Sequence, residues 1–596
     1  MTTYSAPLKD MQFVINDVLQ ISKYSNLPGF ADASEDVVEA ILEEGAKLAS
    51  NVLHPINLSG DSEGCTRHDD ASVTTPSGFK EAYNTFKEGG WQGLSFDPEY
   101  GGQGLPYVLS IIINEMIAGA NVAFGMYPGL AMGASLAIHA HGTDEQKNAY
   151  LPKMVAGDWG GTMNLTEPHC GTDLGMLRTK AVPQEDGSYK ITGTKIFISA
   201  GENDLYDNII HLVLARIEGG PPGVKGISLF IVPKYHLDEN GEPGERNGVA
   251  CGSIEEKMGI HGNSTCVMNY DDATGYLLGE PHKGLRAMFT MMNEARLAVG
   301  LQGIAVSEVS YQNGASYAKD RIQGRALTGA EDPEKQADPI IVHPDVRRML
   351  MDQKAFNEGG RAWMYWTALH SDLHQRSEDA ATREKADDYM GLMTPILKAY
   401  LTDKGYAHAT NAQQIYGGHG YVKEWGMEQF VRDARIAMIY EGANGIQALD
   451  LVGRKLMKDG GRAWQSFFKE VDEFISDNQG NEELQPYLDG LGDVKKDVEE
   501  ATQWFASNAM ANLNNAGASS NDYLHLWGLF CLAHGWAQLA KAAIERKNGG
   551  DDDPFFANKL ITGKYFLDRL LPERHSHLAK IKSGADAMMA LPAEAF

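Results

Sequence analysis

The period of the hydrophobic pattern changes twice along this chain. Between about residues 163 and 285, short runs rich in β-branched and aromatic residues are bounded by Gly, Pro, Asn and Asp, which is typical of strands joined by turns. These runs lie at residues 189–199, 208–216 and 226–232. Before and after this region, apolar residues recur at helical spacing instead. A single helical bundle or a single sheet is therefore excluded, and we expect an α+β protein with separate helical and β regions.

The second helical region is long enough to hold more than one domain. Helical patterns return after Gly284 and run to about Lys458, and a further stretch of about 136 residues follows Gly460. Turn-rich segments at 512–521 and 548–554 are expected to separate the helices of that stretch. We predict an N-terminal helical domain (1–160), a middle β domain (161–285), a helical domain (286–460) and an additional C-terminal helical domain (461–596).

The chain is strongly acidic. Its 596 residues include 80 Asp and Glu against 52 Lys and Arg, which gives a formal charge of −28. This charge repels nucleic acid phosphates and anionic lipid headgroups, so we expect neither nucleic acid nor membrane as a partner. The five cysteines form no CxxC pair, which favours a reducing compartment without disulfides or structural metal. The opening residues lack a basic segment followed by an apolar one, and we predict a cytoplasmic protein.

One stretch is long enough to be weighed as a membrane span. Residues 116–140 carry no Asp, Glu, Lys or Arg. They include Gly119, Gly125, Pro128 and Gly129, which would expose backbone groups of a single helix to lipid. We therefore expect two buried segments that line a cavity.

The sequence lacks the common phosphate-binding motifs of nucleotide enzymes. Neither GxxxxGK[ST] nor a GxGxxG after a strand is present. The segment 165–174, Leu-Thr-Glu-Pro-His-Cys-Gly-Thr-Asp-Leu, turns at Gly171 and offers backbone amides and threonine hydroxyls to an anion or a ring edge. A simple hydrogen-bonded turn explains the same residues. His169 and Cys170 are adjacent, but neighbours in an extended turn usually point apart, which disfavours metal or nucleophile chemistry.

Glu441 is the candidate general base. It follows the apolar run 436–440 and precedes Gly442, so it is expected to emerge at the edge of a buried site. Burial there disfavours the charged carboxylate and raises its pKa towards the working range of a base. The alternative is an acid that stabilises a helix N-terminus beside the turn.

Six short motifs occur here in the order known from the acyl-CoA dehydrogenase family, and the chain resembles that family over roughly residues 80 to 455. The motifs lie at residues 166–173, 193–199, 414–421, 432–434 and 440–443 and at Arg321. The resemblance implies an N-terminal helical domain, a middle β-barrel domain and a four-helix domain that holds FAD and substrate. It also implies that FAD lies at the domain junction and across a subunit interface, so that the protein is an oligomer.

The family's reaction assigns roles to residues at the matching positions. Glu441 would remove the α-proton of an acyl-CoA thioester while the β-hydrogen leaves as hydride to the flavin. Oxyanion donors would be the Glu441 backbone amide and a flavin hydroxyl. Substrate contacts would come from Thr172, Arg296 and Tyr440. FAD contacts would come from Leu165, Thr166, Gly171, Thr172, Phe197, Ser199, Arg321, Gln414, Gly417 and Gly418, the last four of them reaching a neighbouring subunit.

Length and end motifs narrow the resemblance further. The opening residues 4–13, the 166–173 variant and the long C-terminal part resemble a bacterial subgroup that includes 3-(methylthio)propanoyl-CoA dehydrogenases of dimethylsulfoniopropionate demethylation. This subgroup implies that substrate, a homodimer, and electron transfer flavoprotein as the acceptor. The alternatives are a short- or medium-chain fatty acyl-CoA dehydrogenase, an oxidase that uses oxygen, and a DNA-binding flavoprotein relative, which the acidic charge disfavours.

Overall fold

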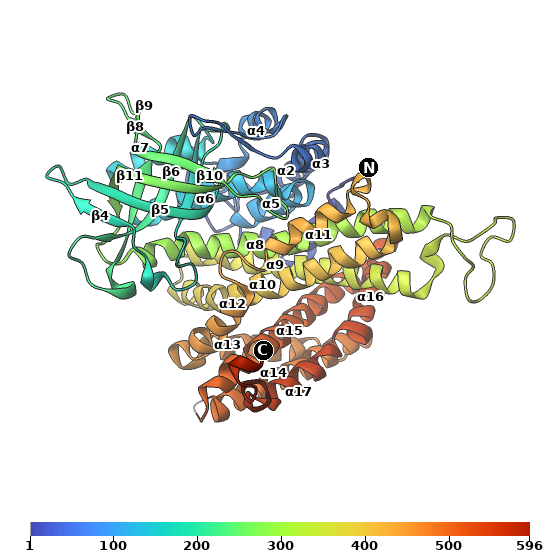
Figure 1. Cartoon of the computed structure of the whole chain (residues 1–596). Helices are drawn as coiled ribbons and strands as arrows, with labels where there is room; N and C mark the ends of the chain where they lie inside the picture. The colour runs from blue at the N-terminus through green and yellow to red at the C-terminus, as the bar shows by residue number, and fades with distance from the viewer. Residues whose placement is uncertain (1, 510) are drawn as a thin grey trace. The chain divides into compact units, whose positions relative to one another are not determined.

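The computed structural model describes residues 2–509 and 511–596, and the chain divides into two compact units. The first unit contains Met1–Glu43, Pro106–Glu115 and Val299–Phe596, and the second contains Glu44–Leu105 and Met116–Ala298. Helices come first along the chain, then the strands, and then long helices to the C-terminus (Figure 1). The predicted α+β class is confirmed.

The β region of the second unit closes into a ring. Going round it, β5 pairs with β4, β4 with β6, β6 with β7, β7 with β11, and β11 again with β5. Strands β3 and β10 extend the sheet from β6 and β11. The strand bounds are β3 (Trp159–Asn164), β4 (Lys180–Pro183), β5 (Tyr189–Ser199), β6 (Asn208–Ile217), β7 (Ile227–Pro233), β10 (Val249–Ile254) and β11 (Thr265–Leu278).

Alternation along β6 explains why its apolar run forms a strand buried on both faces. Ile210, Leu212 and Leu214 pack in a core with residues of helix α6 (Val122–His141). Val213 and Ala215 point the other way, into the core that fills the ring. A continuous apolar run buried on two faces is the pattern that such a strand requires.

The uncharged stretch belongs to two helices that are separated by Asn121, and both are mostly buried, as predicted for its two segments. Helix α5 (Tyr107–Ala120) ends there, and the Asn121 side chain accepts a hydrogen bond from the backbone N–H of Phe124 to begin α6. Helix α6 is long and apolar enough to cross a membrane by length and composition, but 67% of its apolar window is buried within the protein. It therefore serves as a core helix.

Shorter elements complete the second unit. Two hairpins lie outside the ring, β1 (Thr66–Arg67) with β2 (Val73–Thr74) and β8 (Tyr235–Leu237) with β9 (Pro243–Arg246). Its remaining helices are α3 (Asn57–Glu63), α4 (Phe79–Glu88) and α7 (Asp144–Val155). Helices α2 (Glu35–Lys47), α5 and α8 (Gly284–Asp320) are divided between the units.

Long helices build the first unit. Helix α8 approaches α10 closely, because a Cβ at Gly303 would lie 2.3 Å from the Leu401 carbonyl oxygen. Glycine is therefore required where the two backbones cross. The helices of this unit are α1 (Leu8–Phe13), α9 (Pro344–Arg376), α10 (Ala380–Ile415), α11 (Met427–Ile436), α12 (Asn444–Asp450), α13 (Arg462–Asp477), α14 (Gln485–Asn508), α15 (Leu513–Asn548), α16 (Pro554–Tyr565), α17 (Glu573–Ser583) and α18 (Asp586–Met589).

One predicted break in the C-terminal part is wrong in its extent: α14 ends at Asn508, and α15 begins again at Leu513. The segment 512–521 was expected to be a turn, but α15 already begins at Leu513, after an Asn512 side chain that accepts from the N–H of Asn514. The buried Ser519 hydroxyl donates to the Ile581 carbonyl, which ties this small-residue stretch to α17. Tertiary packing thus overrides the weak helical preference of Asn, Gly and Ser. The other predicted break, between α15 and α16, is confirmed.

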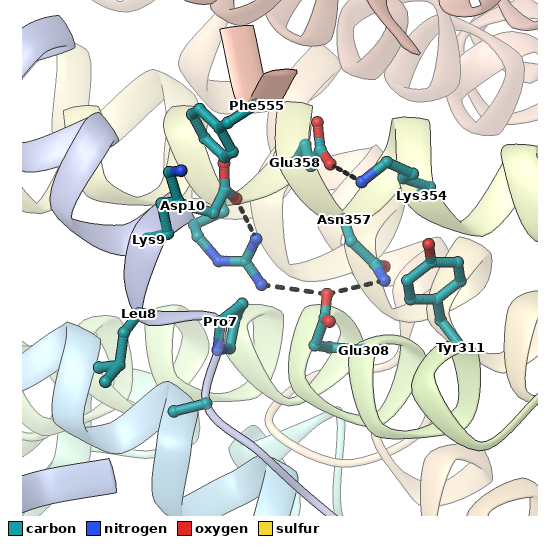
Figure 2. Close-up of a pocket in the computed structure, with 12 residues that line it drawn as sticks. Pro7, Leu8, Lys9, Asp10, Glu308, Tyr311, Lys354, Asn357, Glu358 and Phe555 are labelled. Atoms are coloured by element: carbon teal, nitrogen blue, oxygen red, sulfur yellow. Dashed lines mark hydrogen bonds and ion pairs between the residues drawn. The ribbon is translucent and has the colours of Figure 1, made fainter. Parts of the chain in front are cut away.

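A buried cluster of charges joins distant parts of the first unit. Arg361, on α9, donates to Glu115 at 2.9 and 2.6 Å and to Glu308 at 3.2 Å, and it also pairs with Asp10. The Tyr365 hydroxyl donates to the second Glu115 oxygen at 2.6 Å. Side chains of this cluster line a pocket of about 490 Å³ (Figure 2).

The same cluster ties the C-terminal helices to the long helices. Lys559, on α16, pairs with Asp10 and lies 2.7 Å from Glu358, which also pairs with Lys354. These attractions hold the pKa of Asp10 at about 2, against the effect of its burial. Because each of these charged groups already has a partner, the cluster acts as a structural joint.

Candidate active site

In the second unit, a buried lysine fixes the segment that follows β3. Lys195 donates to the Leu165 carbonyl oxygen at 3.0 Å and to the Glu167 carboxylate at 2.9 Å. The Ile196 N–H donates to the Thr166 carbonyl oxygen at 2.9 Å. These bonds hold Leu165 and Thr166 alongside β5.

Glu167 is saturated by donors. Besides Lys195, it accepts from the Thr179 hydroxyl at 2.6 Å and from the backbone N–H groups of Thr179 and Arg178 at 3.0 and 2.8 Å. Burial lowers the pKa of Lys195 to about 8, although Glu167 opposes the shift. Burial acts to raise the pKa of Glu167, but Lys195 and Thr179 outweigh it and the pKa is lowered. The pair is therefore ionised at neutral pH.

Replacing Lys195 by methionine is expected to destabilise this unit. The change leaves a buried carboxylate without its cation, and the expected loss is about 2 kcal/mol of unfolding free energy, because three other donors remain. Urea denaturation measures it. The double variant Lys195→Met with Glu167→Gln is expected to recover part of the loss, and a double variant no more stable than the single one would show that the pair is not the cause.

Phe197 stands in a strained and exposed position on β5. Its φ is 60°, in the left-handed region, and 60% of the residue is exposed. Ser199, two residues on and half-buried, pairs with Thr265 in the sheet. An exposed aromatic face beside short hydroxyl donors suits a flat, polar-edged ring, so these residues fit the isoalloxazine of FAD.

The exposed turn after Glu167 holds two more candidates of this unit. Gly171 and Thr172 are exposed and free to meet a ligand. The ligand atoms of Glu167, His169 and Cys170 lie within 4.8 Å of one another, close enough to hold a metal ion. Glu167 is already saturated, however, and His169 lies 2.9 Å from the Met176 carbonyl oxygen. The chemistry of the set therefore does not favour a metal.

In the first unit, four further candidates lie at the ends of two helices. Arg321 follows α8, and Gln414, Gly417 and Gly418 lie at the end of α10. All four are exposed, and a Cβ at either glycine would meet nothing within 4 Å. The ring of Tyr317, on α8, stacks on Tyr416 at 4.0 Å and thereby joins the two helix ends. An exposed guanidinium and open glycine backbone, on two helix ends that this stacking joins, fit the phosphates of a dinucleotide.

Glu441 lies on a strained loop between α11 and α12. Its φ is 58°, and that of Gly442 is 89°, so two successive residues are left-handed. Glu441 is half-buried. Burial raises the pKa of the Tyr440 hydroxyl, and the negative charge of the neighbouring Glu441 raises it further. The Tyr440 hydroxyl donates to the Gln302 side chain on α8. Backbone strain at a non-glycine residue often marks a functional site.

The predicted residues thus fall into separate groups. The second unit brings Leu165, Thr166, Phe197 and Ser199 together at the C-terminal half of β5. It also holds Arg296, which is buried with its guanidinium 5.9 Å from the Phe289 ring centre. The first unit holds the Glu441 loop and the helix-end group.

Sequence reasoning missed the residues that support these groups. Lys195 shares the inward face of β5 with Ile191, four residues earlier, and a lysine at an inward strand position signals a buried ion pair. Gln302 carried no such signal, because its partner is distant in sequence.

The chain was compared with known protein families, with curated proteins and with solved structures. Four family models match the chain in order: acyl-CoA dehydrogenase N-terminal domain at residues 62–158, middle domain at 162–273, C-terminal domain at 282–457, and acetyl-CoA dehydrogenase C-terminal like at 467–592. The fold is therefore an N-terminal helical domain, a middle β-barrel domain, a four-helix domain and an additional C-terminal module, as predicted.

Individual relatives agree over the whole length. The chain is 41% identical over 592 residues to 3-methylmercaptopropionyl-CoA dehydrogenase of Ruegeria pomeroyi, covering 98% of this chain and 99% of that one. It is 36% identical over 618 residues to the broad-specificity linear acyl-CoA dehydrogenase FadE5 of Mycobacterium tuberculosis, covering 100% of both. The FAD-complexed acyl-CoA dehydrogenase structure from Bacillus anthracis shares the fold, with a TM-score of 0.74 at 23% identity over 92% of this chain and 88% of that one. The chain belongs to the acyl-CoA dehydrogenase family of FAD-dependent oxidoreductases.

Proposed function

We propose that this protein oxidises an acyl-CoA thioester to the α,β-unsaturated thioester, with Glu441 as the base that removes the α-proton. The observation that carries this assignment is the placement of Glu441 on a left-handed, half-buried loop anchored by Tyr440. A carboxylate held in one strained position keeps its geometry as substrate enters, which lowers the cost of reaching the transition state.

Each residue of the proposed site would have a separate role in the dehydrogenation. Glu441 takes the proton from the carbon next to the thioester carbonyl, and its backbone N–H donates to the carbonyl oxygen as negative charge develops there. Bound FAD supplies the acceptor for the β-hydrogen, which leaves as hydride. Tyr440 and Arg296 shape the acyl site, and Thr172 contacts CoA.

The FAD site would combine the flavin-ring residues of one subunit with the helix-end group of a neighbouring subunit. Phe197 would cover a ring face, Leu165, Thr166 and Ser199 would contact the ring, and Gly171 and Thr172 would lie near the pyrophosphate. The helix-end residues Arg321, Gln414, Gly417 and Gly418 would hold the ADP half of an FAD bound to a neighbouring subunit. The exposed face of Phe197 and the open backbone at the two helix-end glycines support this proposal. The FAD bound to the Bacillus anthracis relative supports it as well.

The proposed substrate is 3-(methylthio)propanoyl-CoA, oxidised to 3-(methylthio)acryloyl-CoA in dimethylsulfoniopropionate demethylation. Full-length similarity to the Ruegeria pomeroyi enzyme supports it. A linear fatty acyl-CoA is the alternative, supported by similarity to FadE5.

A substrate panel tests this choice. We expect kcat/KM for 3-(methylthio)propanoyl-CoA to exceed that for butanoyl-, hexanoyl- and octanoyl-CoA by about tenfold, because one methylene-sized change in a pocket is typically worth 1–3 kcal/mol. Hexanoyl-CoA is the control without sulfur, and its linear chain is one atom longer than the chain that carries the thioether. Equal or higher kcat/KM for hexanoyl-CoA would favour the fatty acyl alternative and leave the reaction type standing.

The oligomeric state and the electron acceptor are also part of this proposal. We expect a cytoplasmic homodimer that passes electrons to electron transfer flavoprotein, and light scattering measures its mass. Comparing electron transfer flavoprotein with oxygen as oxidant separates a dehydrogenase from an oxidase. The charge of −28 continues to disfavour a DNA-binding relative.

A further inference from the structure

We propose that a chain of side chains, Lys398, Asn444, Asp403 and His525, positions the loop of the base, and that the C-terminal module takes part in it through His525. This inference rests on the proposed role of Glu441.

Lys398 holds the loop directly. It lies on α10, is fully buried, and donates to the Gly442 carbonyl oxygen at 2.8 Å, one residue beyond Glu441. Gln447 donates to the same carbonyl at 3.0 Å and to the Glu441 carbonyl at 3.3 Å. The left-handed backbone of the loop is therefore fixed from two sides.

Asn444 connects this lysine to the helix behind it. Its side-chain oxygen accepts from Lys398 at 2.8 Å. Its side-chain nitrogen donates to Asp403 at 2.7 Å and to the Thr402 hydroxyl at 3.0 Å, both on α10. Asn444 is the first residue of α12, three positions after Glu441, so its orientation sets how the chain leaves the loop.

The C-terminal module reaches the chain at its far end. His525, on α15, lies 2.9 Å from the second oxygen of Asp403, and both side chains are largely buried. The His525 ring packs edge-on against Tyr400 and lies 5.4 Å from His577 of α17. The module thus contributes more than packing: it fixes the carboxylate that orients Asn444.

Lys398 and Asn444 act as positioning residues for the Glu441 loop. A left-handed backbone is strained at a non-glycine residue and relaxes unless its surroundings hold it. The buried Lys398 ammonium and Asn444 amide provide that restraint at Gly442, and neither is placed here in contact with substrate. Losing them should move the carboxylate and slow proton removal with little effect on substrate affinity.

Variants of Lys398 and Asn444 test whether these two residues position the Glu441 loop. With FAD-loaded protein and butanoyl-CoA as probe, we expect Lys398→Met and Asn444→Ala to lower kcat by about 10–100-fold, the effect of a small misplacement. KM and FAD content should stay within a factor of two to three of the wild type. Unchanged kcat in both variants would overturn the proposal.

Variants of His525 test the link to the module, and they also serve if Lys398→Met fails to fold. His525→Phe keeps the ring and removes the hydrogen bond, and a several-fold loss of kcat is expected. His525→Gln places a donor near the lost nitrogen and should restore most of the activity. Equal kcat for the two variants would exclude a role of this hydrogen bond.

Thr502→Val is the matched control. It removes a buried hydrogen bond of the same module, 2.6 Å from the Thr502 hydroxyl to that of Tyr523, without touching the chain of residues. It should lower the melting temperature and leave kcat unchanged. A kcat loss as large as that of His525→Phe would show that general loosening of the module is responsible. Failure of the unmodified protein to oxidise any acyl-CoA would instead contradict the proposed function itself.

Discussion

Glu441→Gln is expected to lower the turnover of acyl-CoA by about 10³-fold, within the range for loss of a general base. Glutamine keeps the size and the polar edge of the side chain but cannot accept the α-proton. The loop should retain its shape, because the bonds from Gln447 and Tyr440 do not involve the carboxylate. Steady-state kinetics with an artificial electron acceptor, at equal FAD content, measures the effect.

Glu424→Gln is the control for this substitution. Glu424 is exposed on the segment before α11, so the same chemical change there should leave turnover within a factor of two. Wild-type turnover in Glu441→Gln would remove Glu441 as the base. Equal losses in both variants would point to an effect of net charge.

The second large effect is expected in stability. Arg361→Met removes the cation that Asp10, Glu115 and Glu308 share in a fully buried cluster. Breaking a buried ion pair from one side costs about 4 kcal/mol, because the remaining charges stay desolvated. Guanidinium denaturation should show this loss in the transition of the first unit.

Lys541→Met is the matched control for Arg361→Met. Lys541 pairs with Glu545 on the surface of α15, and exposed pairs of this kind contribute about 0–0.5 kcal/mol. A stability of Arg361→Met within 1 kcal/mol of wild type would mean that the carboxylates take up protons or water at little cost.

Local patterns predicted the elements because each pattern needs only neighbouring residues. The run of β-branched and aromatic residues at 189–199 forms β5 with the same bounds, and the helical pattern that was predicted to return after Gly284 begins there with α8. Ring closure of the sheet could not be derived in this way, because it depends on β7 pairing with both β6 and β11. The early start of α15 was missed because Ser519 is satisfied by Ile581, 62 residues away.

In the candidate site, too, short sequence motifs were predictive and contacts between residues distant in sequence were not. The order of motifs led to Glu441 and to the flavin-ring and helix-end residues, which remain proposals. Their supports were not predictable: Lys398 precedes the loop that it holds by more than forty residues, and His525 follows it by more than eighty. A buried lysine in an apolar helix, such as Lys398, is nevertheless a signal that a partner exists, because burying an unpaired ammonium is very costly.

Anaerobic mixing of the FAD-loaded protein with 3-(methylthio)propanoyl-CoA tests the central claim most directly. The wild type is expected to lose its yellow flavin absorbance within the first turnover, and Glu441→Gln to stay yellow while it still binds the thioester. Retention of the colour by the wild type with this thioester and with butanoyl- to octanoyl-CoA, despite full FAD content, would contradict the account.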